Sequence, residues 1–91
     1  MEKTLYQPEY RILLDLLREV RKEAGVNQEV LATRTGFTQS QVSKVERGER
    51  RLDVIELRRW CQEFGVSLPE FIERFEGALR QKTTSKKTRV R

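Results

Sequence analysis

The sequence has 91 residues, of which 36% are hydrophobic and 36% are charged, and its net charge is +5. This length fits one folded domain and leaves no room for a second core. A single cysteine cannot form an internal disulfide, and the absence of histidine argues against a metal site. The sequence also has no apolar run long enough for a membrane span. The first residues lack the apolar segment of a signal peptide, so we expect a cytoplasmic protein. Without histidine and with a single cysteine, we expect neither a metal nor a cofactor.

The positive charge is concentrated at the C-terminus. Residues 80–91 contain six basic residues and no acidic one, whereas residues 1–79 contain 13 basic and 14 acidic residues. We expect residues 80–91 to form a basic disordered tail, because this composition buries too little apolar surface to fold. The tail is either a solubilising terminus or an arm that contacts phosphates. Within the domain, residues 34–59 hold the more informative cluster, with seven basic and four acidic side chains.

The first predicted helix runs from Pro8 to Ala24. Proline suits the first turn of a helix, and Gly25 suits its end. The apolar positions follow helical spacing: Tyr10, Leu13, Leu14, Leu17, Val20 and Ala24. Ile12 and Leu16 make the apolar face wider than a one-sided helix needs. These two residues are either covered by the N-terminal residues or the last helix, or available to another chain.

Residues 27–48 have the pattern of two short helices joined by a tight turn. Asn27 can cap the first helix, and Gly36 provides the backbone freedom that a sharp turn requires. Thr38 can cap the second helix, and Gly48 can end it. The inward positions of the first helix are predicted to be Val30, Leu31, Ala32 and Thr35.

The second of these helices has few apolar residues. Val42 and Val45 are its only regular apolar positions, so it should pack along one narrow stripe and expose the rest of its surface. The outward groups are of the types that bind base edges and phosphates: Gln39, Ser40, Gln41, Ser43, Lys44 and Arg47. We interpret residues 27–48 as a helix-turn-helix.

A fourth helix is predicted after a basic loop at residues 48–52. Asp53 can cap it. Its core-facing positions are expected to be Val54, Leu57, Trp60, Cys61 and Phe64. Both Trp60 and Cys61 fall within this apolar stripe, so we predict a buried indole and a buried, inert thiol.

A fifth helix is predicted after Ser67, which can cap it. Its apolar positions lie on one face: Leu68, Phe71, Ile72, Phe75 and Leu79. Gly77 has a low helix propensity, which weakens the prediction that this helix continues past Glu76. The sequence therefore predicts a compact all-α domain of five helices over residues 8–79.

The spacing of residues in this region is that of a known family. The central motif is Gln28-x-x-Leu31-Ala32-x-x-x-Gly36-Phe37-Thr38-Gln39-x-x-Val42-Ser43-x-Val45-Glu46-x-Gly48, flanked by Leu17-Arg18-x-x-Arg21-x-x-x-Gly25 and Leu57-x-x-Trp60-Cys61-x-x-Phe64-Gly65-Val66. This pattern covers roughly residues 10–76 and resembles the lambda-repressor/Cro-like helix-turn-helix family, also called the XRE family. The resemblance implies a five-helix domain whose third helix, residues 38–47, lies in the major groove of double-stranded DNA.

The resemblance also implies roles for individual residues. Base edges would be read by the outward positions of the third helix, namely Gln39, Ser40, Ser43 and Lys44. Phosphates would be contacted by Gln28, Thr38, Gln41, Arg47, Arg50 and Arg51. Family members often pair the residues that correspond to Arg21 and Glu46, so a partly buried ion pair is expected between the first and third helices.

Two features depart from the family pattern. Trp60 stands where an aliphatic residue is usual, and Cys61 stands where alanine is common, and both changes alter packing only. Ser40 and Ser43 are short, so specificity would lean on water and on DNA shape as well as on direct contacts.

The resemblance implies a sequence-specific transcriptional regulator at the nucleoid, with repression the favoured action. Domains of this size usually bind a pseudo-palindromic operator as a homodimer. The alternative is an antitoxin-like module that binds a partner protein and regulates its own gene as a secondary role. An enzyme is not expected, because the sequence has no glycine-rich phosphate loop, metal constellation or nucleophile–base pair.

Overall fold

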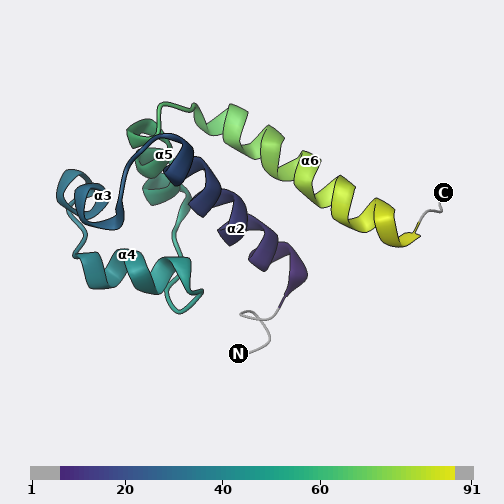
Figure 1. Cartoon of the computed structure of the whole chain (residues 1–91), viewed down its shortest axis with the longest axis horizontal. Helices are drawn as coiled ribbons and strands as arrows, with labels where there is room; N and C mark the ends of the chain where they lie inside the picture. Colours follow the sequence, from purple (N-terminus) through teal and green to yellow (C-terminus); the bar gives the residue numbers. More distant parts are fainter. Residues whose placement is uncertain (1–6, 88–91) are drawn as a thin grey trace.

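A computed structural model describes the backbone of residues 7–87 and the side chains of residues 7–81. Five helices follow in chain order: α2 (Pro8–Glu23), α3 (Gln28–Thr35), α4 (Gln39–Glu46), α5 (Val54–Glu63) and α6 (Leu68–Lys87) (Figure 1). Within the described residues every regular element is a helix, and none of these helices is long and apolar enough to cross a membrane. The predicted all-α fold of five helices is confirmed.

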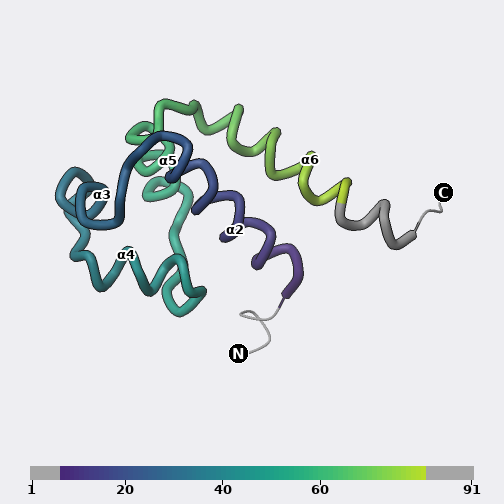
Figure 2. The backbone as a smooth tube through the Cα atoms, in the orientation of Figure 1, coloured from purple at the N-terminus to yellow at the C-terminus, as the bar shows by residue number. Residues whose placement is uncertain are grey.

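Contacts between pairs of helices join all five helices into one unit. Helix α3 packs against α4 and α5, while α2 packs against both α4 and α6. Figure 2 shows α6 running along the side of α2 that faces away from α4. Because α4 contacts its neighbours through one side, its other side is left at the surface.

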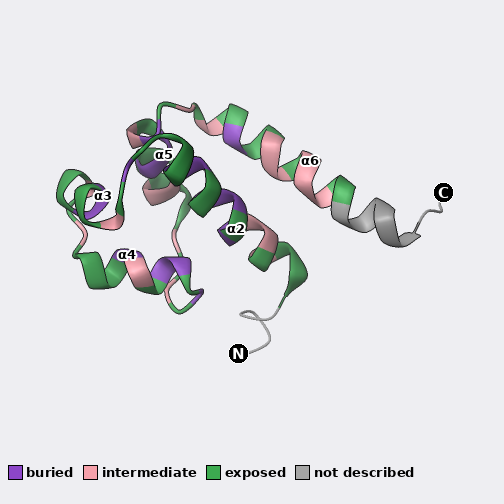
Figure 3. Ribbon diagram, in the orientation of Figure 1, coloured by how far each residue is buried: buried purple, intermediate pink, exposed green. Residues whose placement is uncertain are grey.

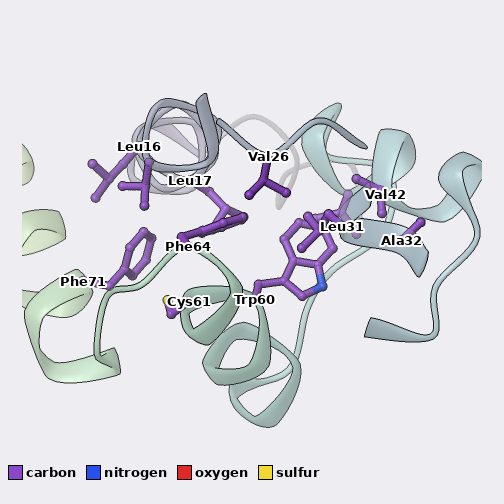
Figure 4. Packing of buried hydrophobic residues seen from close by; sticks show 12 residues of the cluster. Leu16, Leu17, Val26, Leu31, Ala32, Val42, Trp60, Cys61, Phe64 and Phe71 are labelled. Atoms are coloured by element: carbon purple, nitrogen blue, oxygen red, sulfur yellow. The ribbon is translucent and has the colours of Figure 1, made fainter. Parts of the chain in front are cut away.

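All five helices contribute to one hydrophobic core. Its buried members are Leu16, Leu17 and Val20 of α2, Val26 of the following loop, Leu31 and Ala32 of α3, Val42 and Val45 of α4, Trp60 and Cys61 of α5, Phe64, and Phe71 of α6. Figure 4 shows the Trp60 ring extending from α5 toward Leu31 of α3. The core thus fixes the helix-turn-helix against the rest of the domain.

Trp60 and Cys61 are both fully buried, as predicted. The indole N–H makes no hydrogen bond within the described residues, so Trp60 contributes through packing. Burial raises the pKa of the Cys61 thiol to about 11. The reactive thiolate is therefore scarce at neutral pH, which agrees with a packing role for this cysteine.

The predicted capping residues begin their helices. Asn27, Thr38, Asp53 and Ser67 each accept a hydrogen bond from the backbone N–H three residues later, at 2.8 to 3.2 Å. Gly36 has a φ of 81°, a left-handed conformation that a residue with a Cβ rarely adopts. These short-range signals set where α3 and α4 begin and how sharply the chain turns between them.

Two predicted inward positions are wrong. Val30 is 36% exposed and Val54 is 60% exposed. In α3, Leu31 and Ala32 take the inward side, and the helical rotation of about 100° per residue turns Val30 away from it. Val54 begins α5 one turn before Leu57, which is itself only partly buried, so the apolar stripe extends beyond the packed part of the helix.

The apolar surplus of the first helix is largely covered. Leu16 is 7% exposed and belongs to the core, and Ile12 is partly buried. Helix α6 packs against α2. This agrees with the expectation that the last helix covers part of the wide apolar face of the first helix. In α6 itself Phe71 is fully buried, whereas Ile72 remains 39% exposed.

Helix α6 is longer than the sequence predicts. It passes through Gly77 and ends at Lys87, so the expected disorder from residue 80 does not agree with the helical backbone of residues 80–87. Arginine, glutamine and lysine are good helix formers, and adding residues to an existing helix costs far less than starting one. The remainder of the expected tail, residues 88–91, lies outside the described residues.

Candidate nucleic-acid interface

The four residues predicted to read bases lie together on α4. Val42 and Val45 of this helix are fully buried, so they fix which side faces the core. The four residues predicted to read bases lie on the other side: Gln39, Ser40 and Lys44 are exposed, and Ser43 is partly buried. Figure 3 shows α4 as exposed at its N-terminal end and more buried toward its C-terminal end.

Most of these side chains keep their hydrogen-bonding groups unused. Gln39, Ser40 and Lys44 form no side-chain hydrogen bond or ion pair with the part of the chain that the structure describes. Ser43 differs, because its hydroxyl accepts a hydrogen bond from Nη1 of Arg47. The outward side of α4 therefore offers an amide, a hydroxyl and an ammonium group to a ligand.

A capping box fixes the first turn of α4. The Gln41 Oε1 accepts a hydrogen bond from the Thr38 N–H at 2.9 Å, and the Thr38 Oγ1 accepts one from the Gln41 N–H at 3.0 Å. Both bonds use side-chain oxygens as acceptors. The amide N–H groups of Gln41 and the hydroxyl hydrogen of Thr38 remain as donors, which is what a phosphate requires.

An ion pair joins α2 to the end of α4. Arg21 donates from Nε to Oε2 of Glu46 at 2.6 Å and from Nη2 to Oε1 at 3.1 Å. Its Nη1 donates to the Val26 carbonyl at 2.9 Å. The Glu46 side chain is 1% exposed and that of Arg21 is 9% exposed, so the pair is almost completely shielded from water.

Gln28 joins the same network from the start of α3. Its Nε2 donates to Oε1 of Glu46 at 2.9 Å, which leaves one amide hydrogen for a phosphate. Arg18 lies nearby, with its Nε 3.5 Å from the same oxygen. Burial alone would raise the pKa of Glu46, but the hydrogen bonds from Arg21 and Gln28 outweigh it and hold the pKa below its usual value.

The three arginines predicted to contact phosphates are held by neighbouring side chains. Arg47 donates from Nε to Oε2 of Glu49 at 3.0 Å. The Arg51 guanidinium lies over the Tyr10 ring, 4.6 Å from its centroid. Arg50 interacts with both a carboxylate and an aromatic ring. Through Arg50 and Arg51 these contacts connect the loop after α4 to α2, to α5 and to the turn before α4.

Two of the side chains that hold Arg50 were missed by the sequence analysis. Glu56 binds its guanidinium, and Phe37 lies under it. The spacing from Asp53 to Glu56 is that of a capping box, which was readable from the sequence. The contact with Phe37 joins residues far apart in the chain, and no local pattern indicates it.

Comparison with known proteins agrees with this geometry. The family model described as Helix-turn-helix matches residues 17–71. An uncharacterized HTH-type transcriptional regulator, y4dJ of Sinorhizobium fredii, is 42% identical over 53 residues, which cover 58% of this chain and 69% of that protein.

Solved structures show the same fold. An XRE-family like protein from Pseudomonas syringae pv. tomato has a TM-score of 0.74 and 45% sequence identity, over 82% of this chain and 92% of that one. The restriction-modification controller protein C.Esp1396I, determined as a tetramer in complex with its natural 35 base-pair operator, has a TM-score of 0.71. Its identity is 23%, over 80% of this chain and 96% of that one, so it supports the fold alone.

The matched residues 17–71 include the whole helix-turn-helix, all of α5 and the C-terminal part of α2. The same match to a family of transcriptional regulators supports the expectation that the protein is not an enzyme. The chain belongs to the XRE type of the helix-turn-helix family, a class of DNA-binding transcriptional regulators.

Proposed function

We propose that this regulator represses transcription by binding a pseudo-palindromic operator as a homodimer, with α4 in the major groove. The observation that carries the proposal is the division of α4 into two sides. Val42 and Val45 are fully buried, whereas the polar groups of Gln39, Ser40 and Lys44 make no hydrogen bond or ion pair among the described residues. A polar helix face presented in this way fits the width of the major groove.

Two side chains on this face suit particular base edges. The Gln39 amide can both donate and accept, which matches N6 and N7 of adenine. The Lys44 ammonium is a donor only, which matches O6 and N7 of guanine. Ser40 and Ser43 are short, so the remaining specificity comes from bridging waters and from the shape of the DNA.

Phosphate contacts would fix the register of α4 in the groove. The residues around it retain donors after their internal bonds are counted: Gln28, Thr38, Gln41, Arg47, Arg50 and Arg51. These groups belong to α3, to the turn before α4, to the first turn of α4 itself and to the loop after it. Such contacts position the protein without specifying sequence.

We expect two copies to bind one operator. A single module of this kind buries only about 600–1,000 Å² of protein surface on DNA, and a dimer doubles the contact. Exposed apolar side chains that suit a second copy are present at Val54, Ile55 and Ile72. Sedimentation should show two protein chains on one operator duplex. A protein that is monomeric both free and on operator DNA would contradict the homodimer.

The direct test is a selection from random duplex DNA with the purified full chain. We expect enrichment of one sequence with two inverted half-sites, centred about 10–10.5 base pairs apart or a multiple of that distance. The regulator would act on such sites in the cytoplasm, at the nucleoid. Enrichment of no sequence, with affinity independent of base composition, would refute sequence-specific regulation.

A further inference from the structure

Arg50 lies beside the proposed recognition helix through both its backbone and its side chain. Its backbone N–H donates to the Lys44 carbonyl at 3.3 Å, and the Glu49 N–H donates to the same oxygen at 2.8 Å. The guanidinium lies over the ring of Phe37, 4.9 Å from its centroid. Phe37 directly precedes Thr38, the cap of α4, so Arg50 is within reach of the N-terminal end of that helix.

Glu56 takes one particular edge of the Arg50 guanidinium. Nη1 donates to Oε1 at 3.3 Å and Nη2 donates to Oε2 at 3.2 Å, so the carboxylate binds end-on across the two terminal nitrogens. Nη1 also donates to the Arg51 carbonyl at 3.1 Å. Three of the five N–H groups are therefore used.

The two N–H groups that remain on Arg50 lie on one edge. They belong to Nε and Nη2, which form the side-on fork that binds a phosphate or carboxylate through two parallel hydrogen bonds. The Arg50 side chain is 35% exposed, so a ligand can approach it. Every other edge is taken by Glu56 or by the backbone.

The ring beneath Arg50 is itself held in place. Phe37 meets Trp60 edge-on, with ring centroids 5.4 Å apart and an interplanar angle of 69°. Trp60 is fully buried in the core. The guanidinium is thus held in its plane by Glu56 and from below by a ring that packs against the core, so it loses little freedom when it binds an anion.

We propose that Glu56 is a positioning residue for DNA binding, which holds Arg50 so that its Nε–Nη2 edge binds a backbone phosphate. The inference rests on the proposed function. Net charge alone would predict the opposite effect, because a carboxylate near DNA repels the phosphates and its removal should strengthen binding. The hydrogen bond from Arg50 also lowers the pKa of Glu56, so the carboxylate is ionised at neutral pH.

The test compares Glu56→Gln with the original protein on the selected operator. Glutamine still accepts the Asp53 N–H bond of the capping box, so the start of α5 is preserved while the ionic partner of Arg50 is lost. We expect operator affinity to fall about three- to tenfold, as one charge-assisted contact is weakened. The slope of log affinity against log salt should become shallower by up to about one unit.

Two further variants separate positioning from general effects. Glu63→Gln removes the same charge from the same helix, but from a carboxylate that pairs with Arg34, and it should not weaken binding. In an Arg50→Ala background, Glu56→Gln should cause no further loss, because both changes act on one contact.

The possible failures of this experiment are distinguishable. An original protein that binds no sequence selectively refutes the proposed function. An original protein that binds its operator, with Glu56→Gln equal to it or tighter, overturns the role of Glu56 alone. Equal losses from Glu56→Gln with and without Arg50 would likewise overturn it. Thermal unfolding of each variant confirms that the folded domain is being compared.

Discussion

Glu46→Ala is expected to lower the free energy of unfolding by about 3–5 kcal/mol. The change removes the carboxylate that pairs with Arg21 and leaves the guanidinium charge buried with only the Val26 carbonyl as a partner. Urea unfolding followed by fluorescence measures the effect directly, because Trp60 is the only tryptophan and is fully buried.

A double variant tests whether the loss comes from the stranded charge. Arg21→Met with Glu46→Leu removes both charges and fills the space with apolar groups, and it should recover most of the stability lost in Glu46→Ala. Glu49→Ala is a suitable control, since its pair with Arg47 is about half exposed and exposed ion pairs contribute little to stability, so this change should destabilise far less than Glu46→Ala. Equal destabilisation in the single and double variants would show that the buried charge is not the cause.

The same pair predicts how stability depends on pH. The pKa of Glu46 is lower in the folded protein than the value of about 4.3 expected in an unfolded chain. The unfolded state therefore takes up the proton first as the pH falls, so the contribution of Glu46 is fully present above about pH 4.3 and is lost toward the lower folded pKa. Glu46→Gln should unfold with a weaker acid dependence; an unchanged profile would contradict this assignment.

Local chemistry made much of the fold predictable. Asn27, Thr38 and Asp53 cap their helices through their own side chains and the next turn, so each cap is a property of a few consecutive residues. Gly36 is equally local, because its positive φ is a property of one backbone position. Helical periodicity then placed Leu31, Val42, Trp60 and Phe71 in the core.

Apart from Val30, which helical rotation turns away from the core, the errors arose where a helix extends beyond its neighbours. Val54 fits the apolar spacing of α5, but spacing does not tell where the packed surface stops. The helical backbone of residues 80–87 shows the opposite error, because composition describes an isolated segment and not one that continues an existing helix.

Helical periodicity also made part of the candidate site predictable. Val42 and Val45 fix the orientation of α4, and the exposure of Gln39 and Lys44 follows from that orientation. The Arg50 contacts with Phe37 and Glu56 depend on how the loop after α4 folds back over the domain, so they required the structure.

Gln39→Ala is expected to remove sequence preference at one base pair in each half-site. A bidentate amide–adenine contact contributes about 1–3 kcal/mol of discrimination, and a dimer would lose it twice. Gln39 is exposed in the first turn of α4 and has no side-chain partner among the described residues, so the fold should be unaffected. Titration of the variant on operators with each base pair replaced in turn locates the contact, because only the base pair that Gln39 reads becomes indifferent to replacement.

Lys44→Ala distinguishes base reading from charge on the same helix. Both variants lose a specific contact, but Lys44→Ala also removes a positive charge, so it should weaken binding to unrelated DNA and reduce the salt dependence, whereas Gln39→Ala should leave both unchanged. Gln62→Ala, at an exposed position of α5, is the matched control and should bind as the original does. If both α4 variants keep full affinity and full sequence preference, then α4 is not the recognition helix. Base reading would then have to come from another surface.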